Sequence, residues 1–286
     1  MPKRLPRART LKGDPRLAHY DSGGGAAGEP PIVLLHQSLA RSEDWENIFP
    51  RLATRYRTVA YDARGHGRSG RATDYSLRAF ADDTLRMLRE IVKEPALLVG
   101  HSLGALAALV AAGDAPDLVR GIVLEDPALG YAKAWDPAKY LALREGIAST
   151  EPGVLAKAVS KFPLPSPGPH GERTYGELRG FFAAERVVTY FRDVDPAFID
   201  ARTAGDASAT GLITDAIAKV RAPVLVLAGE PRLGGAVDDP SEWRLKKLPD
   251  VTVKRFPGSG HLLHGFRPEQ FIENIEPFLR KLRESA

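Results

Sequence analysis

Short apolar runs recur through the first half of the chain and return near its end. They lie at residues 30–36, 58–62, 96–99, 121–126, 222–229 and 251–256. Runs of this length without polar alternation are typical of strands covered on both faces. Segments with helical spacing lie between them, such as the one that Ser76 opens and the one that carries Phe271, Ile275 and Leu279. The alternation predicts an α/β fold, with a mostly parallel sheet and helices on both faces.

The alternation stops at Pro127 and resumes at about residue 216. Between these points the chain has no comparable apolar strand, only helical segments separated by Pro and Gly clusters such as residues 162–169. Active sites of parallel sheets lie beyond the carboxyl ends of the strands. We therefore predict a core formed by residues 1–126 and 216–286, with residues 127–215 inserted as a helical cap over that edge.

Composition and charge narrow the function classes only slightly. The 286 residues are 43% hydrophobic and 27% charged, which is typical of a globular protein. The chain has no apolar run long enough for a transmembrane helix, and its lack of cysteine excludes disulfides, thiol nucleophiles and thiolate metal sites. We expect a cytoplasmic protein with no membrane partner.

The formal net charge of +4 has a local source. Residues 1–16 hold six basic side chains and one acidic side chain, so the rest of the chain is close to neutral. This leader has neither the apolar segment of a signal peptide nor the aromatic interleaving of a nucleic-acid site. We expect a solvated N-terminal arm and no nucleic-acid partner.

The strongest chemical signal is the pentapeptide Gly100-His101-Ser102-Leu103-Gly104. It stands between the predicted strand at 96–99 and a small-residue run at 102–112 that predicts a helix. A G-x-S-x-G sequence at such a reversal forms a nucleophile elbow, in which the glycines permit the sharp turn and the serine hydroxyl stands at the sheet edge. Ser102 is therefore the predicted nucleophile.

A serine hydroxyl needs a base within hydrogen-bond reach. His261 directly follows the last predicted strand, in Gly258-Ser259-Gly260-His261, and an imidazole suits a group that accepts and returns a proton near neutral pH. His264 forms an H-x-x-H pair with it, but no third ligand is near in the sequence, so we expect no metal. We expect His66 to be structural, His36 to shape its loop, and His101 to point away from the hydroxyl.

Together these segments resemble the α/β-hydrolase superfamily over nearly the whole chain. The matching segments are residues 36–39, 62–69, 100–104 and 258–261. The resemblance implies an eight-stranded, mainly parallel sheet with a helical cap, and the order nucleophile, acid, histidine along the chain. It implies no cofactor.

The resemblance also implies an oxyanion hole. One donor is the backbone N–H of Leu103, directly after the nucleophile, and the second corresponds to Ser38 in the loop after the strand that ends at His36. The family usually has a His-Gly pair before this second donor. This chain has Gln37 in place of the glycine, so the Gln37 side chain is expected in or near the pocket.

The acid of the triad is the least determined position. Many members carry it as the aspartate of G-x-x-D after the strand that follows the cap, where this chain has Arg232. Asp126, Glu230 and the pair Asp238 and Asp239 remain as alternatives. Asp126 is favoured, because it ends the strand expected beside the nucleophile's strand.

A serine at the elbow favours acyl transfer over the alkyl transfer of family members that use aspartate there. The leading prediction is a serine hydrolase that cleaves a carboxylic ester or lactone through an acyl-enzyme. One alternative is an acyltransferase, perhydrolase or C–C bond hydrolase that uses the same triad. A second is a receptor-like ligand-binding protein with slow turnover. The sequence gives no indication of oligomeric state.

Aromatic residues in the predicted cap are candidates for the pocket wall. They are Trp135, Phe181, Phe182, Tyr190 and Phe191. Each is also a candidate for the cap's own core. Because basic residues do not cluster in the cap, a polyanionic substrate is not indicated.

Overall fold

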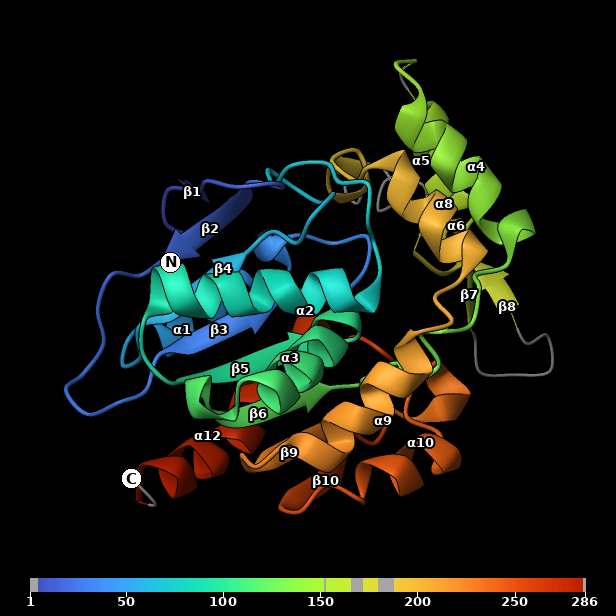
Figure 1. Ribbon diagram of the computed structural model, residues 1–286. Helices are drawn as coiled ribbons and strands as arrows, with labels where there is room; N and C mark the ends of the chain where they lie inside the picture. The colour runs from blue at the N-terminus through green and yellow to red at the C-terminus, as the bar shows by residue number, and fades with distance from the viewer. Residues whose placement is uncertain (1–4, 152, 166–171, 180–187, 285–286) are drawn as a thin grey trace.

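An eight-stranded sheet forms the centre of the computed structural model, which describes residues 5–151, 153–165, 172–179 and 188–284 (Figure 1). The strand order is β1-β2-β4-β3-β5-β6-β9-β10. The strands are β1 (Arg9–Leu11), β2 (Leu17–Asp21), β3 (Ile32–Leu35), β4 (Thr58–Tyr61), β5 (Ala96–His101), β6 (Val119–Glu125), β9 (Val224–Ala228) and β10 (Val251–Arg255). β2 runs antiparallel to β1 and β4, and the strands from β4 to β10 are parallel. The predicted eight-stranded, mostly parallel sheet is confirmed.

Helices cover both faces of the sheet. On one face α2 (Leu77–Arg86), α3 (Leu103–Asp114) and α9 (Ala209–Lys219) pack together, and on the other lie α1 (Phe49–Leu52) and α12 (Pro268–Glu284) (Figure 1). Alternate strand residues serve the two layers: Val33 packs with the first set of helices and Ile32 with the second. This double burial explains why the strands are unbroken apolar runs. In the described residues, no helix has the length and apolar character needed to cross a membrane.

Short elements complete the core. The 3₁₀ turns are η1 (Ser42–Trp45), η3 (Pro116–Leu118) and η4 (Pro231–Leu233), and η2 (Met87–Val92) is a π-helical extension of α2. The remaining core helices are α10 (Asp239–Leu245) and α11 (Leu263–Phe266). As predicted, Ser76 is the N-cap of α2, and its side chain accepts the N–H of Ala79.

The segment between β6 and β9 holds α4 (Pro137–Ala148), α5 (Val154–Ser160), α6 (Tyr175–Arg179) and α8 (Pro196–Ala204). Figure 1 shows these helices gathered at the edge of the sheet toward which β3, β5 and β6 point. The segment is not wholly helical, because β7 (Pro163–Pro165) and β8 (Glu172–Thr174) pair antiparallel. Strands of three residues are too short to show alternation, which is why a purely helical cap was expected. The predicted division at residues 215 and 216 falls inside α9, which packs on α3.

The basic leader differs from the expected solvated arm. Residues 9–11 form the edge strand β1, in which Arg9 pairs with His19 and Leu11 with Leu17. The Leu11 side chain is buried against the core. The expectation of a fully solvated arm is therefore wrong for this part of the leader, because backbone pairing with β2 and burial of Leu11 hold it to the sheet.

Candidate active site

Ser102 occupies a sharp turn between β5 and α3. Its backbone has a φ of 53°, in the positive region that non-glycine residues rarely adopt, and its N–H donates to the carbonyl of Glu125 at 3.0 Å. A Cβ at Gly100 would lie 2.4 Å from the carbonyl oxygen of Gly104, and one at Gly104 would lie 2.3 Å from that of Leu35. Strand and helix therefore approach as closely as the elbow requires only with glycine at both positions.

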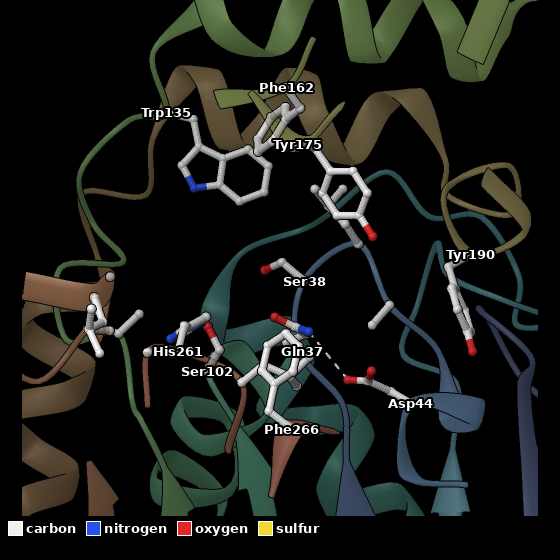
Figure 2. Close-up of a pocket in the computed structure, with 18 of the residues that line it drawn as sticks. Gln37, Ser38, Asp44, Ser102, Trp135, Phe162, Tyr175, Tyr190, His261 and Phe266 are labelled. Carbon is white, nitrogen blue, oxygen red and sulfur yellow. Dashed lines mark hydrogen bonds between the residues drawn. The ribbon is translucent and has the colours of Figure 1, made fainter. Parts of the chain in front are cut away.

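His261 and Asp126 meet at the same edge of the sheet. The imidazole Nδ1 lies 2.6 Å from Asp126 Oδ2. The Asp126 carboxylate is fully buried and also accepts the N–H groups of Gly229 (3.0 Å) and Ala236 (2.7 Å). A carboxylate held by three donors cannot rotate away from the ring. His261 and Ser102 both line the pocket above the sheet, and Figure 2 shows their side chains together at its base.

The other predicted acids lie elsewhere. Glu230 forms an ion pair with Arg232 and accepts a backbone N–H from the turn that precedes the histidine. Asp238 is the N-cap of α10, and Asp239 is the first residue of that helix. Among the hydrogen bonds of the described residues, the His261 ring donates to one carboxylate, that of Asp126.

The loop after β3 brings Ser38 to the pocket, where Leu39 has a φ of 63°. Two buried histidines hold this loop. His66 Nε2 accepts the N–H of Leu39 at 3.2 Å, and His36 Nε2 accepts the N–H of Ala63 at 2.9 Å. Each ring therefore carries its proton on Nδ1, which donates to a backbone carbonyl.

Burial keeps both of these histidines neutral. It lowers the pKa of His36 and lowers that of His66 to about 3. In the described part of the chain, the N–H groups of Ser38 and Leu103 have no hydrogen-bond acceptor. Ser38 lines the pocket and Leu103 directly follows Ser102, so their two N–H groups can stabilise negative charge on an oxygen held beside the Ser102 hydroxyl.

Sequence reasoning missed a second histidine–carboxylate pair beneath the site. His264 Nδ1 lies 2.6 Å from Glu125 Oε2, and Glu125 Oε1 accepts the N–H groups of Leu263 and His264. The Nε2 of His264 lies 3.1 Å from the carbonyl oxygen of Asp44 and 3.6 Å from its carboxylate. Trp45 stacks on the ring with centroids 3.9 Å apart. The H-x-x-H spacing was the one available signal, and it did not indicate an acidic partner.

Charges in this cluster stabilise one another. Burial alone would lower the pKa of His264, but Glu125, assisted by Asp44, raises it to about 10. The charge of His264 in turn outweighs burial and lowers the pKa of Glu125. Burial lowers the pKa of His101 to about 4.

The side chains of His101, Glu125 and His264 place possible metal-ligand atoms within 4.8 Å of one another. Their hydrogen bonds account for that proximity, since the His264 Nδ1 faces Glu125 and the His101 Nε2 faces the carbonyl of His261 at 2.9 Å. As expected from the sequence, His101 thus turns away from the pocket and supports the loop that carries His261.

A cavity of about 1620 Å³ lies above Ser102. Of the expected wall residues, Trp135, Tyr190 and Phe191 line it, whereas Phe181 and Phe182 fall outside the described residues. Further aromatic residues line it that the sequence did not single out: Tyr131, Tyr140, Phe162, Tyr175 and Phe266. Gln37 lines it too, as expected, and its amide donates to Asp44 at 3.4 Å (Figure 2).

Comparison with known proteins agrees with this architecture. The family model described as the alpha/beta hydrolase fold matches residues 30–268. The 2-(acetamidomethylene)succinate hydrolase of Mesorhizobium japonicum is 29% identical over 260 residues, which cover 88% of this chain and 89% of that protein. The pimeloyl-[acyl-carrier protein] methyl ester esterase of Edwardsiella ictaluri is 40% identical over 111 residues, which cover 38% and 42% of the two chains.

A solved structure extends the likeness to three dimensions. The crystal structure of E-2-(acetamidomethylene)succinate hydrolase superposes with a TM-score of 0.66 at 25% identity, and the match covers 96% of this chain and 99% of that one. The residues matched by the family model include the elbow and the loops that carry Ser38, Asp126 and His261. This chain belongs to the alpha/beta hydrolase family of hydrolytic enzymes.

Proposed function

We propose that this protein is a serine hydrolase that cleaves a carboxylic ester or lactone through an acyl-enzyme intermediate. The observation that carries the proposal is the 2.6 Å contact between His261 Nδ1 and Asp126 Oδ2 beside the elbow serine. With its Nδ1 proton donated to Asp126, the imidazole has Nε2 free to accept a proton. Ser102, His261 and Asp126 then act as nucleophile, base and orienting acid.

The proposed reaction has two halves. Ser102 Oγ attacks the substrate carbonyl while His261 takes its proton, and the N–H groups of Ser38 and Leu103 bind the oxyanion. His261 then protonates the leaving alkoxide, and the acyl group remains on Ser102. Water that gives its proton to the same ring attacks the acyl-enzyme; the ring returns that proton to Ser102 Oγ as the bond to the acyl group breaks, and the carboxylic acid is released. The proposed reaction uses no cofactor.

Ester cleavage is preferred because an alkoxide leaves more readily than an amine. Of the two relatives described above, the Edwardsiella ictaluri protein is named as a methyl ester esterase and the Mesorhizobium japonicum protein as a hydrolase of an acetamido compound. A test therefore includes matched aryl esters, lactones and anilides. In this proposal the segment from α4 to α8 acts as the cap over a small-molecule substrate.

Labelling with a fluorophosphonate tests the nucleophile. We expect the folded wild-type protein to be labelled at Ser102 and the Ser102→Ala variant to remain unlabelled. Ser259→Ala, which removes a second serine from the same pocket, is the matched control and should be labelled as the wild type is. A wild-type protein that stays unlabelled would overturn the hydrolase proposal.

Product analysis separates the alternatives that share the triad. Release of free acid in water, undiminished by added alcohol or peroxide, supports hydrolysis. Acyl product found only on the added acceptor assigns transfer or perhydrolysis instead. Rapid labelling with negligible turnover of every ester, lactone and diketone assigns the receptor-like alternative.

A further inference from the structure

Arg202 is a buried cation in the wall of the pocket that holds Ser102. The residue lies on α8 and is 2% exposed. Among the described residues, no carboxylate oxygen lies within 4.0 Å of its guanidinium. Leaving a buried charge without a counter-ion is costly, so a protein retains one where something offsets that cost.

Protein groups satisfy Arg202 only in part. Its Nη2 donates to the carbonyls of Tyr131 (2.8 Å) and Lys133 (3.3 Å). The guanidinium carbon lies 3.6 Å from the ring centre of Tyr131 and 5.3 Å from that of Trp135. Its Nε is buried without a hydrogen-bond partner. Stacking and carbonyl contacts orient the guanidinium but supply no negative charge.

The acid that acts on Arg202 from a distance is already occupied. Asp206 contributes to the electrostatics of the guanidinium, but its Oδ2 accepts the N–H of Leu77 at 2.8 Å and its Oδ1 accepts the hydroxyl and N–H of Ser208. Asp206 therefore links the first residue of α2 to the residue that precedes α9. The charge on Arg202 is left for a group that enters from the pocket.

The opposite side of the pocket carries the reverse charge. Asp44 lines it, and the ion pair of its carboxylate with His264 outweighs burial and lowers the pKa of that carboxyl, so that it is anionic. Figure 2 shows Asp44 and Trp135 at opposite sides of the cavity. An anionic group on a substrate is attracted toward the Arg202 side and repelled from the Asp44 side.

We infer that Arg202, stacked on Tyr131 and Trp135, binds an ionised carboxylate of the substrate. The substrate class is then an ester or lactone that carries a second, free carboxylate group, and in this form the inference rests on the proposed function. Planar guanidinium and carboxylate groups match in geometry, and the buried setting strengthens the bond. One such cation is consistent with a monoanionic group and not with a polyanion.

Two matched substrate pairs test the inference. The first pair is 4-nitrophenyl hemiglutarate and its neutral counterpart 4-nitrophenyl hexanoate, which place the charge on the acyl side. The second is 4-carboxyphenyl butyrate and 4-carboxamidophenyl butyrate, which place it on the leaving group. We expect wild-type kcat/KM to favour the anionic member of one pair by about 10- to 100-fold, the range for hydrogen bonds to charged groups.

The decisive variant is Arg202→Met, which keeps the aliphatic stem and removes the charge. We expect it to lower kcat/KM for the preferred anionic ester by about 10- to 100-fold and to change the neutral ester by less than about threefold. Equal losses for both esters would show that Arg202 only holds the carbonyls of Tyr131 and Lys133, and would overturn the inference.

Two controls separate position from charge. Arg144→Met removes an exposed arginine that pairs with Asp200 and so links α4 to α8 outside the pocket; its selectivity should equal that of the wild type. Lys133→Met removes an exposed cation that lines the same cavity. Loss of selectivity in Lys133→Met, with none in Arg202→Met, would place the carboxylate at Lys133 and overturn the inference.

Direct binding distinguishes failure of this inference from failure of the proposed function. Glutarate should raise the Tm of the Ser102→Ala protein, whereas glutaramide should not, and Arg202→Met in that background should abolish the shift. Absence of a glutarate shift together with absence of anionic preference in the wild type overturns the inference even if Ser102 is labelled. If Arg202→Met does not fold, these wild-type and Ser102→Ala measurements decide alone.

Discussion

Two histidine–carboxylate pairs lie near the end of β6, and their histidines are three residues apart in the sequence. The pairs have the same hydrogen-bond geometry but differ in solvent exposure and in the groups around them. His261 faces Asp126 and His264 faces Glu125, each with an Nδ1–oxygen distance of 2.6 Å, and the two carboxylates are consecutive residues at the end of β6. The His261 side chain is 32% exposed to the pocket, while that of His264 is fully buried. The first ring has a free edge toward substrate, and the second is enclosed by protein.

The difference shows that the surroundings, not the pair itself, set the role. Asp126 is shared among an imidazole and two backbone N–H groups, and the other edge of its histidine opens on the cavity. Glu125 and Asp44 bracket His264 from both ring nitrogens, so the ring keeps its proton. In the proposed mechanism His261 exchanges protons, whereas His264 is a buried cation that holds three segments together.

The largest effect should come from Asp126→Asn. The amide cannot hold the imidazole in the tautomer that leaves Nε2 free, so we expect turnover of an aryl ester to fall about 10⁴-fold. The measurement is kcat on the fraction of protein shown by circular dichroism to be folded. Turnover within tenfold of the wild type would contradict the role of Asp126 as orienting acid.

The isosteric change one residue earlier, Glu125→Gln, should act on stability. It keeps an oxygen for the N–H groups of Leu263 and His264 but leaves a buried imidazolium without its carboxylate. Breaking such a pair costs about 3–5 kcal/mol, which urea unfolding at pH 7 would measure. Turnover per folded molecule should stay within about tenfold of the wild type, and a loss as large as that of Asp126→Asn would contradict the division of roles.

The same pair predicts how stability depends on pH. The pKa of His264 is raised from 6.5 to about 10, so its stabilising contribution is complete below pH 6.5 and is lost as the pH rises toward 10. The pKa of Glu125 is lowered from 4.5, so its contribution is present above pH 4.5 and is lost on acidification. We expect the free energy of unfolding to decline between pH 6.5 and 10 in the wild type. Glu125→Gln should show a shallower decline, and identical slopes would contradict the charged pair.

The smallest effect is expected for Glu230→Gln. Glu230 was a candidate for the triad acid, but it pairs with Arg232 at the surface and with the N–H of Gly258. Ion pairs at the surface contribute little to stability, so kcat and Tm should change little. A loss of activity comparable to that of Asp126→Asn would reverse the assignment of the acid.

Local patterns in the sequence were sufficient for the sheet and for most of the candidate site. The apolar runs gave the strands because each is buried on both faces, and the elbow is recognisable because its glycines are sterically required. Asp126 stayed one of several candidates because its position as the partner of His261 depends on β9 lying beside β6 and on which loop N–H groups reach its carboxylate. That is a property of strand order and not of any short segment.

Features built from distant segments had no such signal. Asp44, Glu125 and His264 come from three parts of the chain and meet because of how η1, β6 and α11 pack. Arg202 lies in an ordinary helical pattern, and only the packing of α8 shows that it is buried at a pocket. The three-residue strands β7 and β8 are likewise defined by pairing alone.

The stacking of Trp45 on His264 also couples tryptophan fluorescence to the charge state of the buried pair of His264 and Glu125. A protonated imidazole in contact with an indole quenches its fluorescence, so Trp45 should be dim in the folded protein. The other two tryptophans lie apart from it: Trp135 lines the cavity and Trp243 is 63% exposed. Tryptophan emission should therefore increase when His264 loses its proton or when the pair separates. Trp45 thus serves as an intrinsic fluorescence probe of the protein core.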